Sequence, residues 1–331
     1  GIWKYIRQVP GERRMKFDMF GFATLSLAIG ALQMLLDRGE QNDWFSSAET
    51  WVEAVLLTTS FIYFVIHTRL TAAEESFFDY RLLKNRNYVT GLLFVFVVGI
   101  VLFSVRALAP TMLQNLMHYP AAMAGLVTAP SGVGTLIAMV VVGRLIGKVD
   151  FRMLLLFGFS ITAISLWQMS GYTLVLSQSD IVWPGVVQGI RLDLVVLPLI
   201  KETFATVSAS MRAQGTAIYS LIRNIGSSIG IALVQALLVR NTQIMHVSLA
   251  EKINYANPAF QDAAIASAYG PGNSAGLAAL NVEVSSQAAM IGYTNDFRLM
   301  MILVLMVIPL LLLVQSPKSR APAPIEHIAA E

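Results

Sequence analysis

The sequence predicts an all-α, polytopic membrane protein with about eight transmembrane helices. Of its 331 residues, 56% are hydrophobic and only 13% are charged, with a mean hydropathy of +0.64, whereas a soluble domain has about 25% charged residues. Eight apolar segments are each about 18–26 residues long, and about 20 residues are enough to cross a hydrocarbon core of about 30 Å. Strands of a membrane barrel are about half that length and alternate in polarity, which these segments do not.

The eight segments form a helix pair followed by a six-helix unit. The predicted spans are 17–36, 50–67, 88–108, 121–146, 153–176, 181–200, 215–239 and 297–314. The regions are a tail (1–16), the helix pair (17–68) with its outer loop (37–49), a loop (69–87), the six-helix unit (88–315) with a long outer loop (241–296), and a second tail (316–331). The long loop contains two helix-compatible stretches, 258–268 and 275–290, and three interpretations stay open: a cap over the outer mouth, interfacial helices, or a passive connection.

Lys and Arg residues predict the orientation. When alternate loops are assigned to one side of the membrane, most of the 23 Lys and Arg residues fall on the side that holds both tails and the loop 69–87. Positively charged loops face the cytoplasm, so both termini of this chain are expected to be cytoplasmic. The chain begins with Gly1, and its first residues lack the apolar region of a signal peptide, so we expect a fragment of a longer protein.

Composition and motifs exclude several classes of function. The chain has no Cys, which excludes disulfides and thiolate ligands, and its 4 His residues show no spacing typical of a metal site. It has no phosphate-binding glycine loop, nucleophile elbow or zinc-protease motif, so neither an enzyme activity nor a cofactor is predicted. The net charge of +3 comes from short loops and reflects topology, so nucleic acid is not an expected partner.

The sixth span carries two charges near its centre, Arg191 and Asp193. A charge in the middle of a membrane helix costs about 2.5–3.5 kcal/mol on insertion scales, so each needs a partner or an aqueous path. Residues two apart on a helix are separated by about 200°, so these two side chains do not pair with each other. Arg223 in the seventh span lies at nearly the same depth as Asp193, which predicts a direct or water-mediated pair and leaves Arg191 to a cavity or another partner.

Five motifs point to one transporter family. They are LQMLLDRGEQNDWFSS at 32–47, LAPTMLQ at 108–114, GLVTAPSGVGTL at 125–136, GRLIGKVDFR at 143–152 and SLIRNIGSSIGIAL at 220–233. With these motifs in this order, and a long outer loop before the last helix, the chain resembles the C-terminal part of the fourteen-span drug:proton antiporters of the major facilitator superfamily, the EmrB/QacA type. The resemblance implies that the first two spans are an extra pair between two six-helix halves, and that the N-terminal half is missing from this chain.

In that family the first and fourth helices of each half line the substrate cavity, and here these are the third and sixth spans. The resemblance therefore implies a substrate or proton pathway along Arg106, Met112, Gln114, Gln188, Arg191 and Asp193. Arg223 of the seventh span joins these candidates as the predicted partner of Asp193. Asp193 is either a protonatable site or part of a structural ion pair. Arg106, near the outer end of its span, either lines the outer vestibule or extends to the lipid headgroups.

Two further motifs are candidates for mechanical roles. The segment 143–152 is implied to hold a cytoplasmic gate shut, or else it is a plain positively charged loop; its candidate residues are Gly143, Arg144, Gly147, Lys148, Asp150 and Arg152. Gly226 and Gly230, four residues apart in the seventh span, are expected to permit close helix packing. Glu49 and Glu53, near the outer end of the second span, are expected to be solvated.

The resemblance implies secondary active transport by alternating access, as proton-coupled efflux of amphipathic or cationic drugs across a bacterial cytoplasmic membrane. The expected partners are a small amphipathic molecule, protons, the lipid bilayer, the missing N-terminal half and a periplasmic adaptor. Two alternatives stay open: a non-transporting membrane scaffold or receptor-like bundle, and a metabolite transporter of the same fold.

Overall fold

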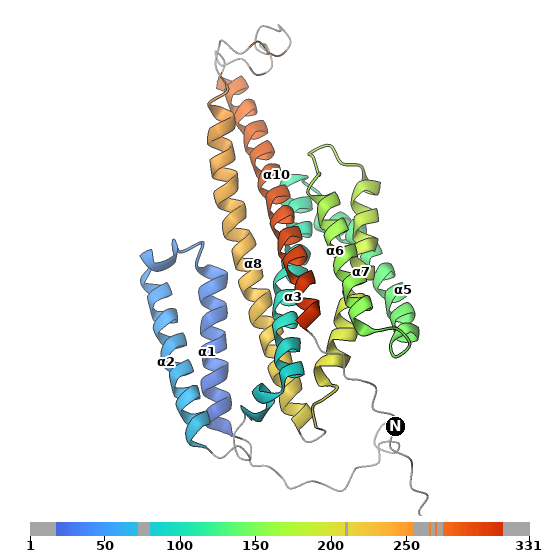
Figure 1. Cartoon of the computed structure of the whole chain (residues 1–331). Coiled ribbons are helices and arrows are strands. Elements are labelled where there is room, and N and C mark those ends of the chain that lie inside the picture. The colour runs from blue at the N-terminus through green and yellow to red at the C-terminus, as the bar shows by residue number, and fades with distance from the viewer. Residues whose placement is uncertain are drawn as a thin grey trace, which may run out of the picture. The chain divides into compact units, whose positions relative to one another are not determined.

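The computed structural model describes residues 18–71, 80–208, 211–253, 258, 265, 269 and 274–313. The helices are α1 (Met19–Arg38), α2 (Ala48–Leu70), α3 (Arg86–Thr111), α4 (Ala121–Thr128), α5 (Pro130–Leu145), α6 (Phe151–Met169), α7 (Gln178–Phe204), α8 (Arg212–Ala250) and α10 (Ser274–Val307) (Figure 1). Among the described residues, eight helical spans are long and apolar enough to cross a membrane. The predicted all-α membrane fold with eight spans is therefore confirmed.

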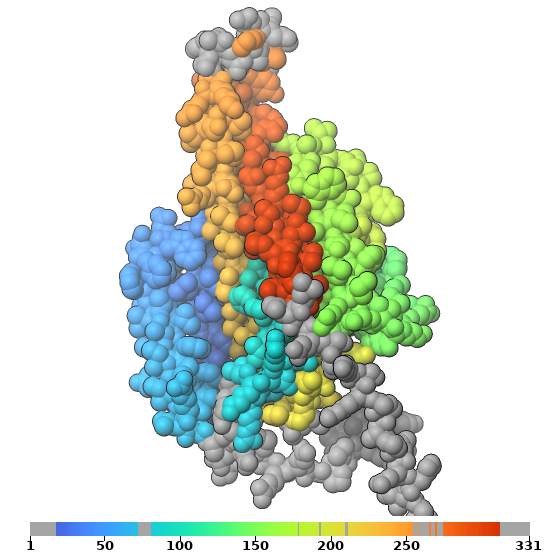
Figure 2. All heavy atoms as spheres, in the orientation of Figure 1, coloured from blue at the N-terminus to red at the C-terminus, as the bar shows by residue number. Residues whose placement is uncertain are grey.

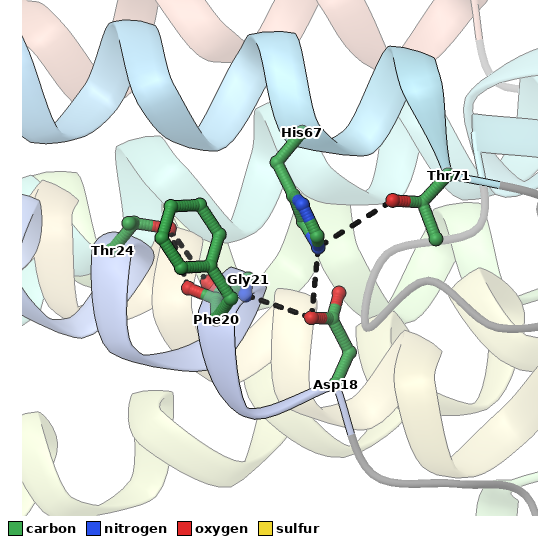
Figure 3. Close-up of polar contacts among 6 residues, drawn as sticks. All are labelled: Asp18, Phe20, Gly21, Thr24, His67 and Thr71. Carbon is green, nitrogen blue, oxygen red and sulfur yellow. Dashed lines mark hydrogen bonds and ion pairs between the residues drawn. The ribbon is translucent and has the colours of Figure 1, made fainter.

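The chain divides into two compact units, one formed by Gly1–Asn85 with Ser208–Ile218 and the other by Arg86–Val207 with Tyr219–Glu331. The first contains the hairpin of α1 and α2. At one end of the hairpin, Asp18 caps α1 by accepting from the backbone N–H of Gly21 at 2.8 Å and contacts Nε2 of His67 at 2.9 Å (Figure 3). At the other end, Arg38 and Glu49 form an exposed ion pair at 2.7 Å. Polar contacts thus join the two helices at both ends.

The buried face of α2 carries Thr50, Glu53, Ser60 and Phe64, which recur at helical spacing, and α2 contacts α1. Glu53 is only 6% exposed, so the expectation that it is solvated is wrong. It lies three residues after the fully buried Thr50, and the helical period therefore places it on the packed face.

In the second unit, α7 contacts α3, α5 and α6, and small residues bring their backbones close. A side chain at Gly134 of α5 would meet the carbonyl of Val186 in α7, and one at Gly189 of α7 would meet the carbonyl of Ser131 in α5. A side chain at Gly158 of α6 would meet Val195 and Leu194 of α7. Close packing of this kind is typical of helix pairs in lipid, where no hydrophobic force holds helices together.

Two of the predicted spans have different internal structure. The span predicted at 121–146 is divided into α4 and α5 at Ala129–Pro130, because Pro130 has no N–H to continue the helical ladder. The span predicted at 88–108 continues to Leu116, with a π-helical segment (Met112–Leu116) following Pro110. This extension carries Met112 and Gln114 on helical backbone.

The region predicted as a long outer loop, 241–296, is largely helical where it is described. α8 continues to Ala250 and α10 begins at Ser274, so the stretch 275–290 is helical and continuous with the last span, while most of 258–268 lies outside the described residues. Helices α8 and α10 run side by side, joined by a hydrogen bond between His246 and Asn281 (3.1 Å), and Figures 1 and 2 show them extending past the ends of α6 and α7. The tails 1–16 and 316–331 and residues 72–79 of the loop 69–87 also lie outside the described residues.

Candidate functional site

A cavity of about 280 Å³ lies within the second unit, among α3, α4, α5 and α7. Its apolar wall includes Leu102, Val105, Met112, Leu113 and Ile181, and its polar wall includes Arg106, Thr128, Ser131, Thr135, Tyr172, Gln188 and Arg191. Gly125 of α4 and Gly185 of α7 also line it, and an added Cβ at either position would meet no atom within 4 Å. These two glycines therefore leave space that larger side chains would fill.

Arg191 is the most deeply buried charge in this wall, with 2% of its surface exposed. It follows Gln188 by three residues on α7, so the helical period brings both side chains to the cavity face. Gln188 donates to the sulfur of Met169 at 2.6 Å. In the described part of the chain, Nε and Nη1 of Arg191 have no hydrogen-bond partner. The cavity therefore presents a guanidinium with unused donors.

Arg106 reaches the same cavity from α3. Met112, in the π-helical segment after α3, lines the cavity too, whereas Gln114 in that segment is exposed and lies outside the lining. The cavity thus brings together Arg106, Met112, Gln188 and Arg191, four of the predicted pathway residues.

Asp193 and Arg223 do not line this cavity. No ion pair joins Asp193 to Arg223 in the described residues, so the direct form of the predicted pair is not formed, and the water-mediated form stays a prediction. Oδ2 of Asp193 and Nε of Arg223 are buried, and neither has a hydrogen-bond partner in the region described. The depth estimate placed both residues at one level but gave no information about the direction in which each helix turns its side chain.

The segment 143–152 forms a tight turn between α5 and α6. Gly147 has φ +92°, a conformation that favours glycine, and Asp150 caps α6 by accepting from the backbone N–H of Arg152 at 3.0 Å. Arg144 lies in the last turn of α5, and Lys148 donates its backbone N–H to the carbonyl of Leu145 at 3.0 Å. Gly143 is helical, and an added Cβ there would meet no atom within 4 Å.

This turn lies against the end of α7, where two residues were missed by sequence reasoning. Nζ of Lys201 is 3.6 Å from the place that a Cβ at Gly147 would occupy, and Glu202 interacts electrostatically with Asp150 and Arg152. Oε1 of Glu202 is buried without a hydrogen-bond partner in the described region. The available signal was an acidic residue at a span end that otherwise carries positive charge.

Asp296 is a second acidic residue that the sequence did not single out. It lies in α10 with 1% of its surface exposed, and neither carboxylate oxygen has a hydrogen-bond partner among the described residues. The prediction assigned it to the end of the outer loop because the apolar run begins only at Phe297. Helix α10 begins at Ser274, before the apolar run, so Asp296 lies inside the helix and is buried.

Gly226 and Gly230 lie where α8 crosses α3. A Cβ at Gly226 would meet the carbonyl of Phe96, and one at Gly230 would meet the carbonyl of Ile100. On the α3 side, a Cβ at Gly99 would meet the carbonyl of Arg223. Glycines on both helices therefore allow close backbone contact at this crossing.

Comparison with known proteins supplies the family. The family model for the Major Facilitator Superfamily matches residues 13–231. The chain is 30% identical over 253 residues to the multidrug export protein EmrB of Escherichia coli (strain K12). This alignment covers 76% of this chain and 49% of that protein. It is 29% identical over 303 residues to EmrB of Haemophilus influenzae (89% of this chain, 58% of that protein). It is 26% identical over 317 residues to the fatty acid resistance protein FarB of Neisseria gonorrhoeae (95% and 62%). The chain thus spans about half to three fifths of the length of these curated relatives.

Proposed function

This chain belongs to the major facilitator superfamily, and from that premise we propose that it is the C-terminal part of a proton-coupled exporter of amphipathic small molecules. The observation that carries the proposal is the cavity of about 280 Å³, whose wall joins apolar side chains to a few polar ones. Small-molecule sites are typically concave and mostly apolar, with few polar groups that orient the ligand. Membership of a transporter family favours transport over catalysis, and the multidrug export relatives support efflux as its direction.

The complete transporter is proposed to contain a second six-helix half, since the matched relatives are longer than this chain. Alternating access then requires the two halves to rock about a central site. The turn 143–152, packed against Lys201 and Glu202 of α7, is the proposed cytoplasmic gate. The charges at this turn agree with a cytoplasmic location, so the termini of the chain are also proposed to face the cytoplasm of a bacterial cell.

A proton site needs a carboxylate that changes protonation as the protein changes conformation. Asp193 is the proposed site because its buried Oδ2 has no hydrogen-bond partner in the described part of the chain and no cation forms an ion pair with it there. Glu53 also has buried oxygens without a partner, but it lies in α2, whereas Asp193 lies in the middle of α7, the helix that lines the cavity with Gln188 and Arg191. An ionisable group at that place in a membrane helix is a functional candidate.

The test uses the full-length protein in everted membrane vesicles that take up a fluorescent amphiphile. Uptake is expected only when the vesicle lumen is more acidic than the outside, because the exporter would exchange lumenal protons for external substrate. Asp193→Asn is expected to abolish the dependence on the gradient, whereas Glu251→Gln, at an exposed acid outside the cavity, should leave it intact. Equal uptake with and without a gradient would refute proton coupling.

An external partner is also proposed for the extended part of α8 and α10. α8 has 39 residues, or about 58 Å at about 1.5 Å per residue, whereas the hydrocarbon core is about 30 Å thick. Exposed apolar side chains on the two helices include Val247 and Val282, at 57% and 64%. A periplasmic adaptor protein that contacts this helical pair would cover such side chains.

A further inference from the structure

The cavity carries positive charge without any acidic residue in its wall. Arg106 and Arg191 both line it, and the lining residues within the described ranges include no Asp or Glu. We propose that this cavity binds an amphipathic organic anion, whose carboxylate or similar acidic group is held by Arg191 and Arg106. The inference rests on the proposed transport function and names the class of substrate, which family membership alone leaves open.

Arg191 is the main binding group proposed for the anion. Its guanidinium has five N–H donors and stays charged, yet only 2% of its surface is exposed, and both Nε and Nη1 have no hydrogen-bond partner in the described residues. A charge buried in this way is strongly destabilising unless a counter-charge or polar ligand satisfies it. A carboxylate accepts two parallel hydrogen bonds from a guanidinium, which is the geometry that arginine recognises best.

The acidic residues on the same helix do not supply that counter-charge. Asp193 follows Arg191 by two residues and is therefore turned about 200° away from it. Glu202 follows Arg191 by eleven residues, about 16 Å along the helix axis, and interacts with the turn 143–152 instead. Asp180, at the start of α7, accepts hydrogen bonds from the backbone N–H and the hydroxyl of Ser177 at 2.9 and 2.7 Å. A second cation, Arg106, shares the cavity instead, which raises the local preference for an anion.

The rest of the wall favours an organic anion over an inorganic one. Leu102, Val105 and Ile181 provide apolar surface, and Met112 adds a flexible thioether that adapts to different shapes. A small inorganic anion would leave most of a cavity of about 280 Å³ in contact with water. An amphiphile places its acid group on the arginines and its apolar part against these side chains, so both surfaces are satisfied.

The experiment measures binding to the full-length protein in phosphatidylcholine nanodiscs. Three fluorescent probes share one dansyl group and one undecyl chain and differ only at the end: a carboxylate, its primary amide, and a quaternary ammonium. We expect the carboxylate to bind about ten- to a hundredfold more tightly than the amide, the range typical of a hydrogen bond to a charged group. The ammonium probe is expected to bind more weakly than the amide.

Substitutions of the two cavity arginines test whether the cavity causes the preference for the carboxylate probe. Arg191→Gln should remove the advantage of the carboxylate over the amide while the amide affinity stays the same, which also shows that the cavity is still folded. Arg191→Lys should retain part of the advantage, because lysine keeps the charge but not the paired donors. Arg106→Gln should give a smaller loss, because Arg106 is exposed. Arg240→Gln, at an exposed arginine of α8 outside the cavity, is the matched control.

Three results would overturn the proposal. Equal binding of carboxylate and amide, or a preference for the ammonium, would show that another part of the complete protein neutralises the arginines. A carboxylate preference that survives Arg191→Gln would place the anion elsewhere. Displacement of the probe by phosphatidylglycerol in the nanodisc would assign the cavity to a lipid headgroup. Because binding is measured without a gradient, a failure of proton-driven uptake would contradict the proposed function and leave this preference standing.

Discussion

Glu53 of α2 is a buried carboxylate whose two oxygens have no hydrogen-bond partner among the described residues. Burying an unsatisfied polar group costs about 1–3 kcal/mol in proteins, and an apolar group of similar shape removes that cost. We therefore expect Glu53→Met to stabilise the protein by about 1–3 kcal/mol, measured as a higher midpoint temperature of thermal unfolding in detergent, with transport in vesicles unchanged.

The matched control is Glu49→Met, one turn earlier on α2, where the carboxylate is 46% exposed and paired with Arg38. Loss of an exposed ion pair lowers stability by at most about 1 kcal/mol. If Glu53→Met lowers the midpoint temperature instead, or abolishes transport, then Glu53 has a partner or a role in the complete transporter, and the prediction is wrong.

The residues that the sequence located well are those whose position follows from hydropathy and period. Arg191 and Gln188 share a face because they are three residues apart, and the structure places both in one cavity. The direct Asp193–Arg223 ion pair was wrong because depth along a helix says nothing about its rotation. Asp296 and Glu202 were missed because the apolar runs that mark spans leave out the polar residues at their ends.

At the element scale, the turn between α5 and α6 contains two glycines with different requirements. Gly147 has φ +92°, where an L side chain is strained, whereas Gly143 is helical and has open space around its missing Cβ. We expect Gly147→Ala to destabilise the turn by about 1–3 kcal/mol and to slow transport, because the turn packs against Lys201 of α7. Initial uptake rates in vesicles and thermal unfolding would measure both effects.

Gly143→Ala is the control for this prediction, and we expect it to leave stability unchanged or raise it by up to about 1 kcal/mol, the difference in helix propensity. Two outcomes count against this interpretation of the turn. If both substitutions have the same effect, the backbone conformation at Gly147 is not what matters. If only Gly143→Ala slows transport, Gly143 contacts the second half of the transporter.

At the scale of the whole molecule, the outer parts of α8 and α10 need an explanation, because these helices are longer than the membrane is thick. α10 with its 3₁₀ extension forms a span of 38 residues, Ser274–Leu311, and α8 has 39 residues, against about 20 that cross the hydrocarbon core. Hydropathy alone placed a loop here, because a helix that leaves the membrane becomes polar without ending. The exposed Val247 and Val282 are not required for packing between the two helices.

Val247→Gln with Val282→Gln is therefore expected to weaken export in cells without changing uptake in everted vesicles. In cells the proposed adaptor receives the substrate, and removing two apolar contacts from an interface lowers its affinity by about tenfold. Growth in the presence of a toxic amphiphile measures the first effect, and gradient-driven uptake measures the second. Glu283→Gln, an exposed polar position of α10, is the control, since it removes no apolar surface. Equal losses in cells and in vesicles would show that the helical pair acts within the transporter itself. Loss of an external partner is expected to lower export in cells only.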